Sequence, residues 1–283
     1  MAISVNTNLT ALTAQKSLSK STTNLQNSLE RLSSGYKINS SKDDAAGMAV
    51  STKLNYKNSS LAVAKNNAQM GVSLLDTAES IMGTIQSNLQ RIRDLTEQAA
   101  NGTYGSDSMT AILKEVQSRV NEITRLASSI EFNGKYLLDG SITEGINLQI
   151  GIENSDTSVI KLSPDLFKDA SAKTLLKLSS EDVSDKYEND TTARAFLNDI
   201  DNAIANISNR VAEVGGIQQR LVTVLDANTA ISASVTNAVS SIQDADIAAE
   251  STIYIKQQIL QQISTSMLSS ANQSSALALS LLS

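Results

Sequence analysis

The stretch Gln257–Ser283, QQILQQISTSMLSSANQSSALALSLLS, carries no charged side chain. It contains too much Ser, Gln, Asn and Ala for a membrane span, which needs about 20 predominantly apolar residues, so no membrane is expected as a partner. Its large apolar residues recur instead at helical spacing. Together with residues just upstream they fall into two seven-residue registers. One register holds Ile253, Leu260, Met267 and Leu281, and the other holds Ile242, Ile263 and Leu277. The tail is therefore expected to be a long amphipathic helix buried against protein.

The opposite end of the chain has the same character. Residues 1–29 hold only Lys16 and Lys20 as charged side chains, and Leu18, Leu25 and Leu32 are again seven residues apart. Two charge-poor amphipathic helices at opposite ends of one chain predict a matched pair. Because each presents an apolar stripe too broad for one partner helix to cover, both are expected to be fully buried only in an assembly.

Composition restricts the function of this chain of 283 residues. Aromatic residues make up 3% and Trp is absent, which is typical of long helices packed side by side rather than of a compact core. The net charge is −6 without a basic run, which argues against nucleic acid as a partner. Cys and His are both absent, so thiolate metal sites, imidazole bases and the triads built on them are excluded, and no cofactor is expected.

Periodicity divides the middle of the chain into helices and one hairpin. Helical spacing predicts three helices, from Val5 to Leu32, from the Asp43-Asp44 pair to Ala99, and over Ser108–Ile130. Alternation predicts a β-hairpin whose inward residues are Ile146, Leu148 and Ile150 on one strand and Ser158, Ile160 and Leu162 on the other. From about Thr191 the helical spacing returns, and we expect it to continue past Ile242 into the tail.

The fold class expected from these patterns is mainly α, an elongated bundle of long antiparallel helices with a small β-hairpin tip, whose terminal helices form a coiled-coil core on assembly. The expected divisions are a terminal core helix over 1–42 that pairs with 243–283, spoke helices over 43–140, a β-rich tip and variable segment over 141–190, and a C-terminal spoke helix over 191–242.

Two acidic motifs have structural explanations. Ser40 and Ser41 stand three residues before Asp43 and Asp44, the spacing of a capping box, which explains the carboxylates better than an acid–base site does. Asp244, Asp246 and Glu250 imitate the start of a calcium loop. The Gly at the sixth position and the acid at the twelfth are missing, so a solvated helix face is favoured.

Long motifs along the chain carry a resemblance to bacterial flagellin. They appear in the family's order as ERLSSGYKINSSKDDAAGMAV at 30–50, QRIRDLTEQAANGT at 90–103, FNGKYLLDG at 132–140 and QQILQQISTSMLSSANQ at 257–273. The resemblance covers essentially the whole chain. It departs from the family in a minimal middle region, in a tail without the proline that many relatives have, and in Thr96-Glu97 where a more apolar pair is common.

The resemblance implies a structural subunit that polymerises into the flagellar filament and gives motility, and not an enzyme. It implies as partners further copies of the chain, an export chaperone and export apparatus, and the filament cap and hook-junction proteins. Composition alone indicates a cytoplasmic protein, because no secretory signal is visible. The resemblance instead implies an extracellular place in the flagellum, reached through type III export without a cleaved signal peptide.

Two alternatives share parts of this pattern. A hook–filament junction protein has the terminal helices but is not expected to keep the full motifs at 30–50 and 90–103. An enzyme grafted on a filament scaffold needs a longer central segment, and a peptidase of that kind needs metal-binding His, which this chain lacks.

The resemblance also implies recognition by a mammalian Toll-like receptor. The matching positions are Arg91 and Leu95 on the second helix and Glu115 on the third, with Arg91 donating hydrogen bonds and Leu95 presenting apolar surface. From the residues alone, Leu95 is the margin of a helical core and Arg91 a solvated side chain. Glu97 is expected to weaken the interaction by adding a carboxylate near Arg91.

Overall fold

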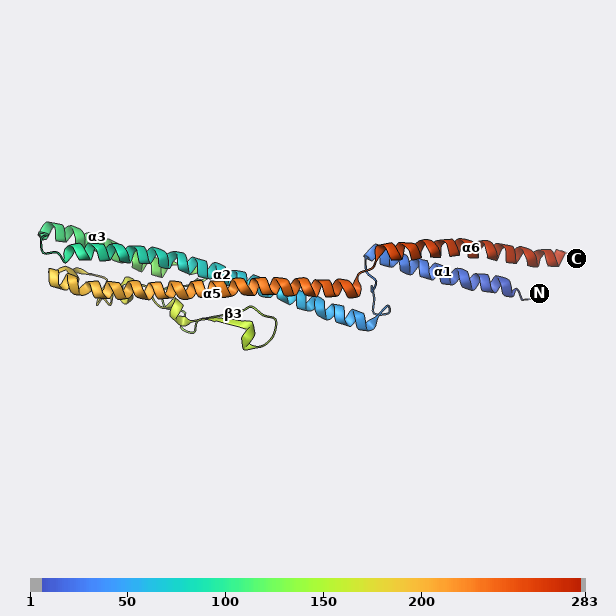
Figure 1. Cartoon of the computed structure of the whole chain (residues 1–283), viewed down its shortest axis with the longest axis horizontal. Helices are drawn as coiled ribbons and strands as arrows, with labels where there is room; N and C mark the ends of the chain where they lie inside the picture. Colours follow the sequence, from blue (N-terminus) through green and yellow to red (C-terminus); the bar gives the residue numbers. More distant parts are fainter. Residues whose placement is uncertain (1–6, 281–283) are drawn as a thin grey trace. The chain divides into compact units, whose positions relative to one another are not determined.

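The computed structural model describes residues 7–280 and the side chains of residues 7–274. The helices and strands are α1 (Leu9–Ser34), α2 (Ala45–Ala99), α3 (Ser106–Ser129), β1 (Glu131–Phe132), β2 (Lys135–Tyr136), β3 (Ile146–Gln149), η1 (Asp156–Ser158), β4 (Val159–Leu162), η2 (Pro164–Phe167), α4 (Ala172–Leu175), η3 (Ser184–Tyr187), α5 (Asp190–Gln243) and α6 (Ile247–Ser280). The expected mainly α fold with long helices and a small hairpin is confirmed (Figure 1).

The chain forms two compact units. We call Met1–Asn58 with Ala233–Ser283 the terminal unit, and Ser59–Ser232 the central unit. The domain limits expected from the sequence stay predictions. No helix in the described part of the chain is long and apolar enough to cross a membrane.

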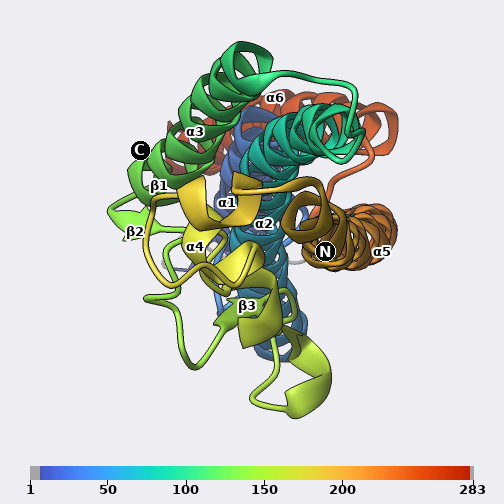
Figure 2. The same cartoon turned by 90° about the vertical axis from the view of Figure 1, so that its left-hand side faces the viewer.

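The central unit is a bundle of α2, α3 and α5 that encloses one hydrophobic core. The apolar spacing of each helix puts one side chain per turn inside, so Leu89, Ile123 and Ile200 are all fully buried. Polar side chains join the helices at the margin of the core, for example Gln86 Nε2, which donates to Ser208 Oγ at 3.2 Å. Figure 2 shows the three helices end on.

The β-hairpin packs on this bundle. Strands β3 and β4 are antiparallel, as expected of the hairpin, and Leu148 lies opposite Ile160. The side chain of Asn67 on α2 donates to the carbonyl of Gln149 at 3.1 Å. The side chain of Asn228 on α5 donates to the next carbonyl, Ile150, at 2.9 Å. The hairpin is thus held by both long helices.

In the terminal unit α1 packs along α6 (Figure 1). As the sequence predicts, α1 ends at the Ser-Ser-Gly interruption, where Gly35 takes a left-handed conformation (φ 76°) and its N–H donates to Arg31 O at 2.8 Å. A glycine suits this position because a side chain is disfavoured at positive φ.

The predicted start of α2 was wrong in detail. The helix begins at Ala45, and Asp44 is the capping residue, because its Oδ1 accepts from the N–H groups of Ala46 and Gly47 at 3.0 Å. Asp43 lies before the helix, where its Oδ2 accepts from the N–H groups of Asn39 and Ser40. These bonds, first of all the one from the Ser40 backbone, lower the pKa of Asp43.

The expected continuation of α5 into the tail was also wrong. The helix ends at Gln243, and α6 starts at Ile247 after Asp246 accepts from the N–H of Ala248 at 2.9 Å. The break is stabilised by the loop after α1, because the N–H of Lys37 donates to Gln243 O at 2.6 Å. A local hydrophobic pattern does not contain this distant backbone contact, so the sequence reading missed it.

Candidate functional site

The seam between α1 and α6 is made of small and polar residues. Its buried members on α1 are Ala14, Ser21 and Ser28, which are seven residues apart, and on α6 they are Glu250 and Ser264. Small side chains let two helices approach closely but bury little apolar area. The paired faces therefore contribute little hydrophobic stabilisation by themselves.

The three leucines predicted on α1 lie at the edge of this seam. Leu18, Leu25 and Leu32 are all half-buried in the subunit. They share the seven-residue spacing of the buried row, and so they follow the seam along the whole helix.

The large apolar residues of α6 lie on its outer surface. Of the predicted filament contacts, Ile253 is 43% exposed, Leu260 37%, Ile263 48% and Met267 60%. Leu277 belongs to α6 but its side chain is outside the described set, and Leu281 lies outside the described residues. Sequence reasoning missed further exposed apolar side chains of the same helices, namely Leu9, Leu12, Leu29, Ile255 and Ile259. The signal that could have found them is the small-residue row of α1, which marks the inner face.

The predicted receptor residues lie in the central unit. Arg91 Nε donates to Glu115 Oε1 at 2.9 Å, and the two side chains are 44% and 37% exposed. The hydrogen bond that Arg91 donates to Glu115 raises the pKa of Arg91. Leu95 is only 3% exposed and packs in the core, so the expectation that it presents apolar surface was wrong. Its side chain belongs to the hydrophobic core of the central unit rather than to the surface.

The expected effect of Glu97 on receptor binding at Arg91 stays a prediction. Glu97 pairs with Arg93 one turn earlier, at 3.2 Å, and Arg93 also donates to Asp201 on α5 at 2.7 Å. The carboxylate of Glu97 is therefore engaged away from Arg91.

A buried polar contact joins α2 to the segment before α5. The hydroxyls of Thr96 and Tyr187 are hydrogen-bonded, and the ring of Phe196 packs edge-on against Tyr187 with centroids 6.0 Å apart. Burial raises the pKa of Tyr187 from 10.0 to about 12. Thr96, which stands where a more apolar residue is common in the family, is therefore hydrogen-bonded to Tyr187.

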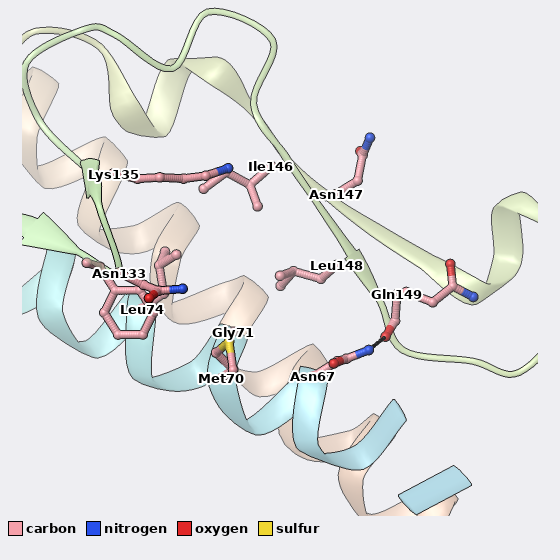
Figure 3. A pocket seen from close by; sticks show the side chains of 11 residues that line it. Asn67, Met70, Gly71, Leu74, Asn133, Lys135, Ile146, Asn147, Leu148 and Gln149 are labelled. Atoms are coloured by element: carbon pink, nitrogen blue, oxygen red, sulfur yellow. Dashed lines mark hydrogen bonds between the residues drawn. The ribbon is translucent and has the colours of Figure 1, made fainter. Parts of the chain in front are cut away.

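A cavity of about 320 Å³ lies between α2 and the hairpin (Figure 3). Leu148 points from β3 to Gly71 of α2, where an added Cβ would lie 2.5 Å from its Cδ1. Lys135 is the one charged residue among the described residues that line it. The lining offers no carboxylate to pair with it for acid–base chemistry.

The acidic motifs have structural roles, but the expected solvated helix face was wrong for Glu250, which is buried. Asp44 and Asp246 accept hydrogen bonds at helix starts, and Glu250 pairs with Arg31. No group of three or more metal-binding side chains occurs among residues 7–274.

Two family models match this arrangement of long terminal helices. They describe the bacterial flagellin N-terminal helical region, over residues 5–143, and the bacterial flagellin C-terminal helical region, over residues 197–282. The flagellin of Listeria monocytogenes is 38% identical over 280 residues, which is 95% of this chain and 96% of that protein. The chain belongs to the bacterial flagellin family. It is a structural subunit that self-polymerises into the flagellar filament.

Another similar protein agrees with this assignment, and one solved structure shares the fold. The flagellar filament 33 kDa core protein of Treponema phagedenis is 35% identical over 292 residues, 98% of this chain and 99% of that protein. A putative flagellar hook-associated protein of Vibrio parahaemolyticus superposes with a TM-score of 0.60 at 17% identity, over 71% of this flagellin and 100% of that chain, which shows the fold alone. The hook-junction alternative is not favoured, because the full-length similarity is to flagellins.

Proposed function

We propose that subunits polymerise through the outward apolar faces of α1 and α6. The observation that carries this proposal is the inverted distribution of side chains, with small and polar residues in the seam and large apolar ones outside. The contacts would be Leu18, Leu25 and Leu32 at the seam edge, Ile253, Leu260, Ile263 and Met267 on the outer face, and Leu277 and Leu281 beyond them.

The energy of assembly would come from covering these side chains. Fully burying one Leu, Ile or Met stabilises by about 1.5–3 kcal/mol, so several such residues offset the entropy lost on association. A contact between different surfaces of neighbouring copies does not close on itself and gives an open helical polymer.

The test is Leu260→Asp, which would place an unpaired charge in a dry interface. We expect this variant to fold its central unit normally, by circular dichroism and thermal unfolding, and to form no filaments by electron microscopy. The matched control is Leu260→Met, which keeps the volume and polarity and should polymerise. Normal filaments from the Asp variant would contradict the proposed face.

Export is proposed on the family relationship. The chain would leave the cell through the flagellar type III apparatus with an export chaperone, without loss of a signal peptide, and would meet cap and hook-junction proteins at the filament. Mass spectrometry of subunits from sheared filaments should find the N-terminal peptide that begins at residue 1 or 2. A mature N-terminus well inside residues 1–30 would contradict this route.

We also propose that a mammalian Toll-like receptor binds the central unit at Arg91 and Glu115, which are exposed and adjacent. Arg91→Ala should lower receptor activation by monomer. Arg125→Ala is the control, because this arginine is also exposed and paired with a glutamate, Glu122. Leu95→Ala would act through packing, so its signalling has to be compared at matched stability. Equal activation by wild type and Arg91→Ala would reject this surface. No catalytic role is proposed.

A further inference from the structure

The seam side chains of α1 repeat every seven residues. The buried positions Ala14, Ser21 and Ser28 are chemically alike, and the half-buried Leu18 and Leu25 repeat in the same way. If α6 slipped by seven residues along α1, its seam residues would meet α1 side chains similar to their present neighbours. Packing alone therefore distinguishes poorly between the observed register and a slipped one.

Three polar contacts distinguish the observed register. From one contact to the next the residue number increases on the α1 side and decreases on α6, so all three fit one antiparallel alignment. They are Asn8 Nδ2 to Ala271 O at 2.9 Å, Gln261 Nε2 to Thr22 Oγ1 at 3.1 Å, and Arg31 Nη1 to Glu250 Oε2 at 3.7 Å. Each contact joins residues more than 200 positions apart in sequence, so none follows from local helix formation.

The ion pair is the most selective of the three. Glu250 is 8% exposed, and Arg31 is the partner that neutralises it. A slip of seven residues in one direction would bring Glu250 to Asn24, and in the other direction past the end of α1 at Ser34. In the first slip the carboxylate would face an uncharged amide, and in the second it would have no α1 residue beside it, so neither slip supplies the cation that Arg31 supplies.

We propose that Arg31 and Glu250, supported by Thr22 and Gln261, set the register in which α1 pairs with α6. The seam is polar because it specifies alignment, while apolar contacts with other copies supply affinity. The effect of the register on polymerisation rests on the proposed assembly faces. A slip of one heptad would displace the outer face of α6 by about 10 Å. An open helical polymer repeats one contact geometry at every subunit, so a slipped subunit would not fit.

The absence of Cys from the chain allows a direct reading of register by disulfide formation. Ser17 and Ser264 line the same small cavity of the seam, so Ser17→Cys with Ser264→Cys reports the observed alignment. Ser17→Cys with Gln257→Cys, or with Ala271→Cys, reports a slip of seven residues in either direction. Cross-linking is read by peptide mass spectrometry in the full-length chain under polymerising conditions, in both the soluble and the filament fractions.

With Arg31 and Glu250 intact, only the 17–264 pair should cross-link. Arg31→Leu with Glu250→Leu replaces the ion pair by apolar side chains and so avoids an unpaired charge; in this background all three pairs should cross-link. Arg31→Glu with Glu250→Arg restores opposite charges and should restore the single 17–264 product. Exclusive 17–264 cross-linking in the double-Leu background, or slipped products that persist in the charge-swapped chain, would overturn the inference.

The experiments test the register proposal and the proposed assembly faces independently. Filaments of normal appearance from Leu260→Asp would reject the outer face and leave the cross-linking result intact. Single-register cross-linking in every background would reject the register role even where Leu260→Asp abolishes filaments.

Discussion

The central bundle and the terminal helix pair use similar helices in opposite ways. In the central unit, large side chains such as Leu75, Ile85 and Phe196 are fully buried in one core. Along α1 and the described side chains of α6, Ala14 is the only buried apolar residue, while Leu9 and Met267 are 70% and 60% exposed.

This difference in buried apolar side chains indicates which part of the subunit can fold alone. Removing apolar area from water supplies about 25 cal/mol per Å², so the central core is stabilised within one chain. The terminal pair gains little in this way, and isolated helices are marginal in water. We therefore expect its stability to depend on neighbouring copies.

The largest effect expected is on the central core. Leu89→Ala removes a fully buried side chain and should lower the free energy of unfolding of the central unit by about 2–5 kcal/mol. Ile259→Ala, at a position 50% exposed on α6, should change it by less than about 0.5 kcal/mol but weaken polymerisation. Urea unfolding of the monomer followed by circular dichroism measures both. An equal fall in the free energy of unfolding in both variants would contradict the difference between the two regions.

The next effect is an alkaline loss of stability at Tyr187. Its folded pKa of about 12 lies above the ordinary 10.0, so its contribution is fully present below pH 10 and is lost as the pH rises from 10 to 12. The loss should reach about 2–3 kcal/mol. Tyr187→Phe removes this component, so the difference between variant and wild type in chemical unfolding from pH 8 to 12 isolates it. A pH-independent difference would show that Tyr187 ionises normally in the fold.

A smaller gain is expected from making the seam apolar. Gln261→Leu replaces the contact with Thr22 by a hydrophobic one and should stabilise the α1–α6 pair in the monomer by about 1 kcal/mol. Hydrogen exchange of the α6 amides measures this as increased protection. The control is Gln262→Leu at the adjacent exposed position, which should leave protection unchanged. An equal response of the two variants would show that the seam does not limit pairing.

The smallest effect is expected at a surface ion pair. Arg125 donates to Glu122 at 2.8 and 2.7 Å, but both side chains are well exposed. Solvent screens such a pair, so Arg125→Ala should leave Tm unchanged within experimental error. A clear fall in Tm by calorimetry would mean that surface electrostatics, and not only the core, support the central bundle.

Much of the fold could be predicted from the sequence. The end of α2 at Ala99, the start of α5 near Thr191 and the hairpin of β3 and β4 follow from local periodicity and turn residues. The break at Asp244–Asp246 could not be predicted, because the backbone bond between Lys37 and Gln243 that stabilises it joins residues far apart in sequence.

The candidate site divides in the same way. Seven-residue spacing identified Leu260 and Met267 as members of helical stripes, but spacing does not say which stripe faces the partner helix within the chain. Leu95 shows the reverse error, because a residue at the margin of a stripe is covered once a third helix packs beside it.

The sequence by itself determined the long helices, the hairpin, the absence of thiol and imidazole chemistry, and the family. These depend on composition, local periodicity and long motifs. Only the tertiary structure decided that the terminal helices meet through Ser21, Ser28 and Glu250 and leave Ile263 and Met267 outside. The physical reason is that a face becomes inner or outer only when a second helix packs on one side of it, and that choice depends on contacts between residues at opposite ends of the chain.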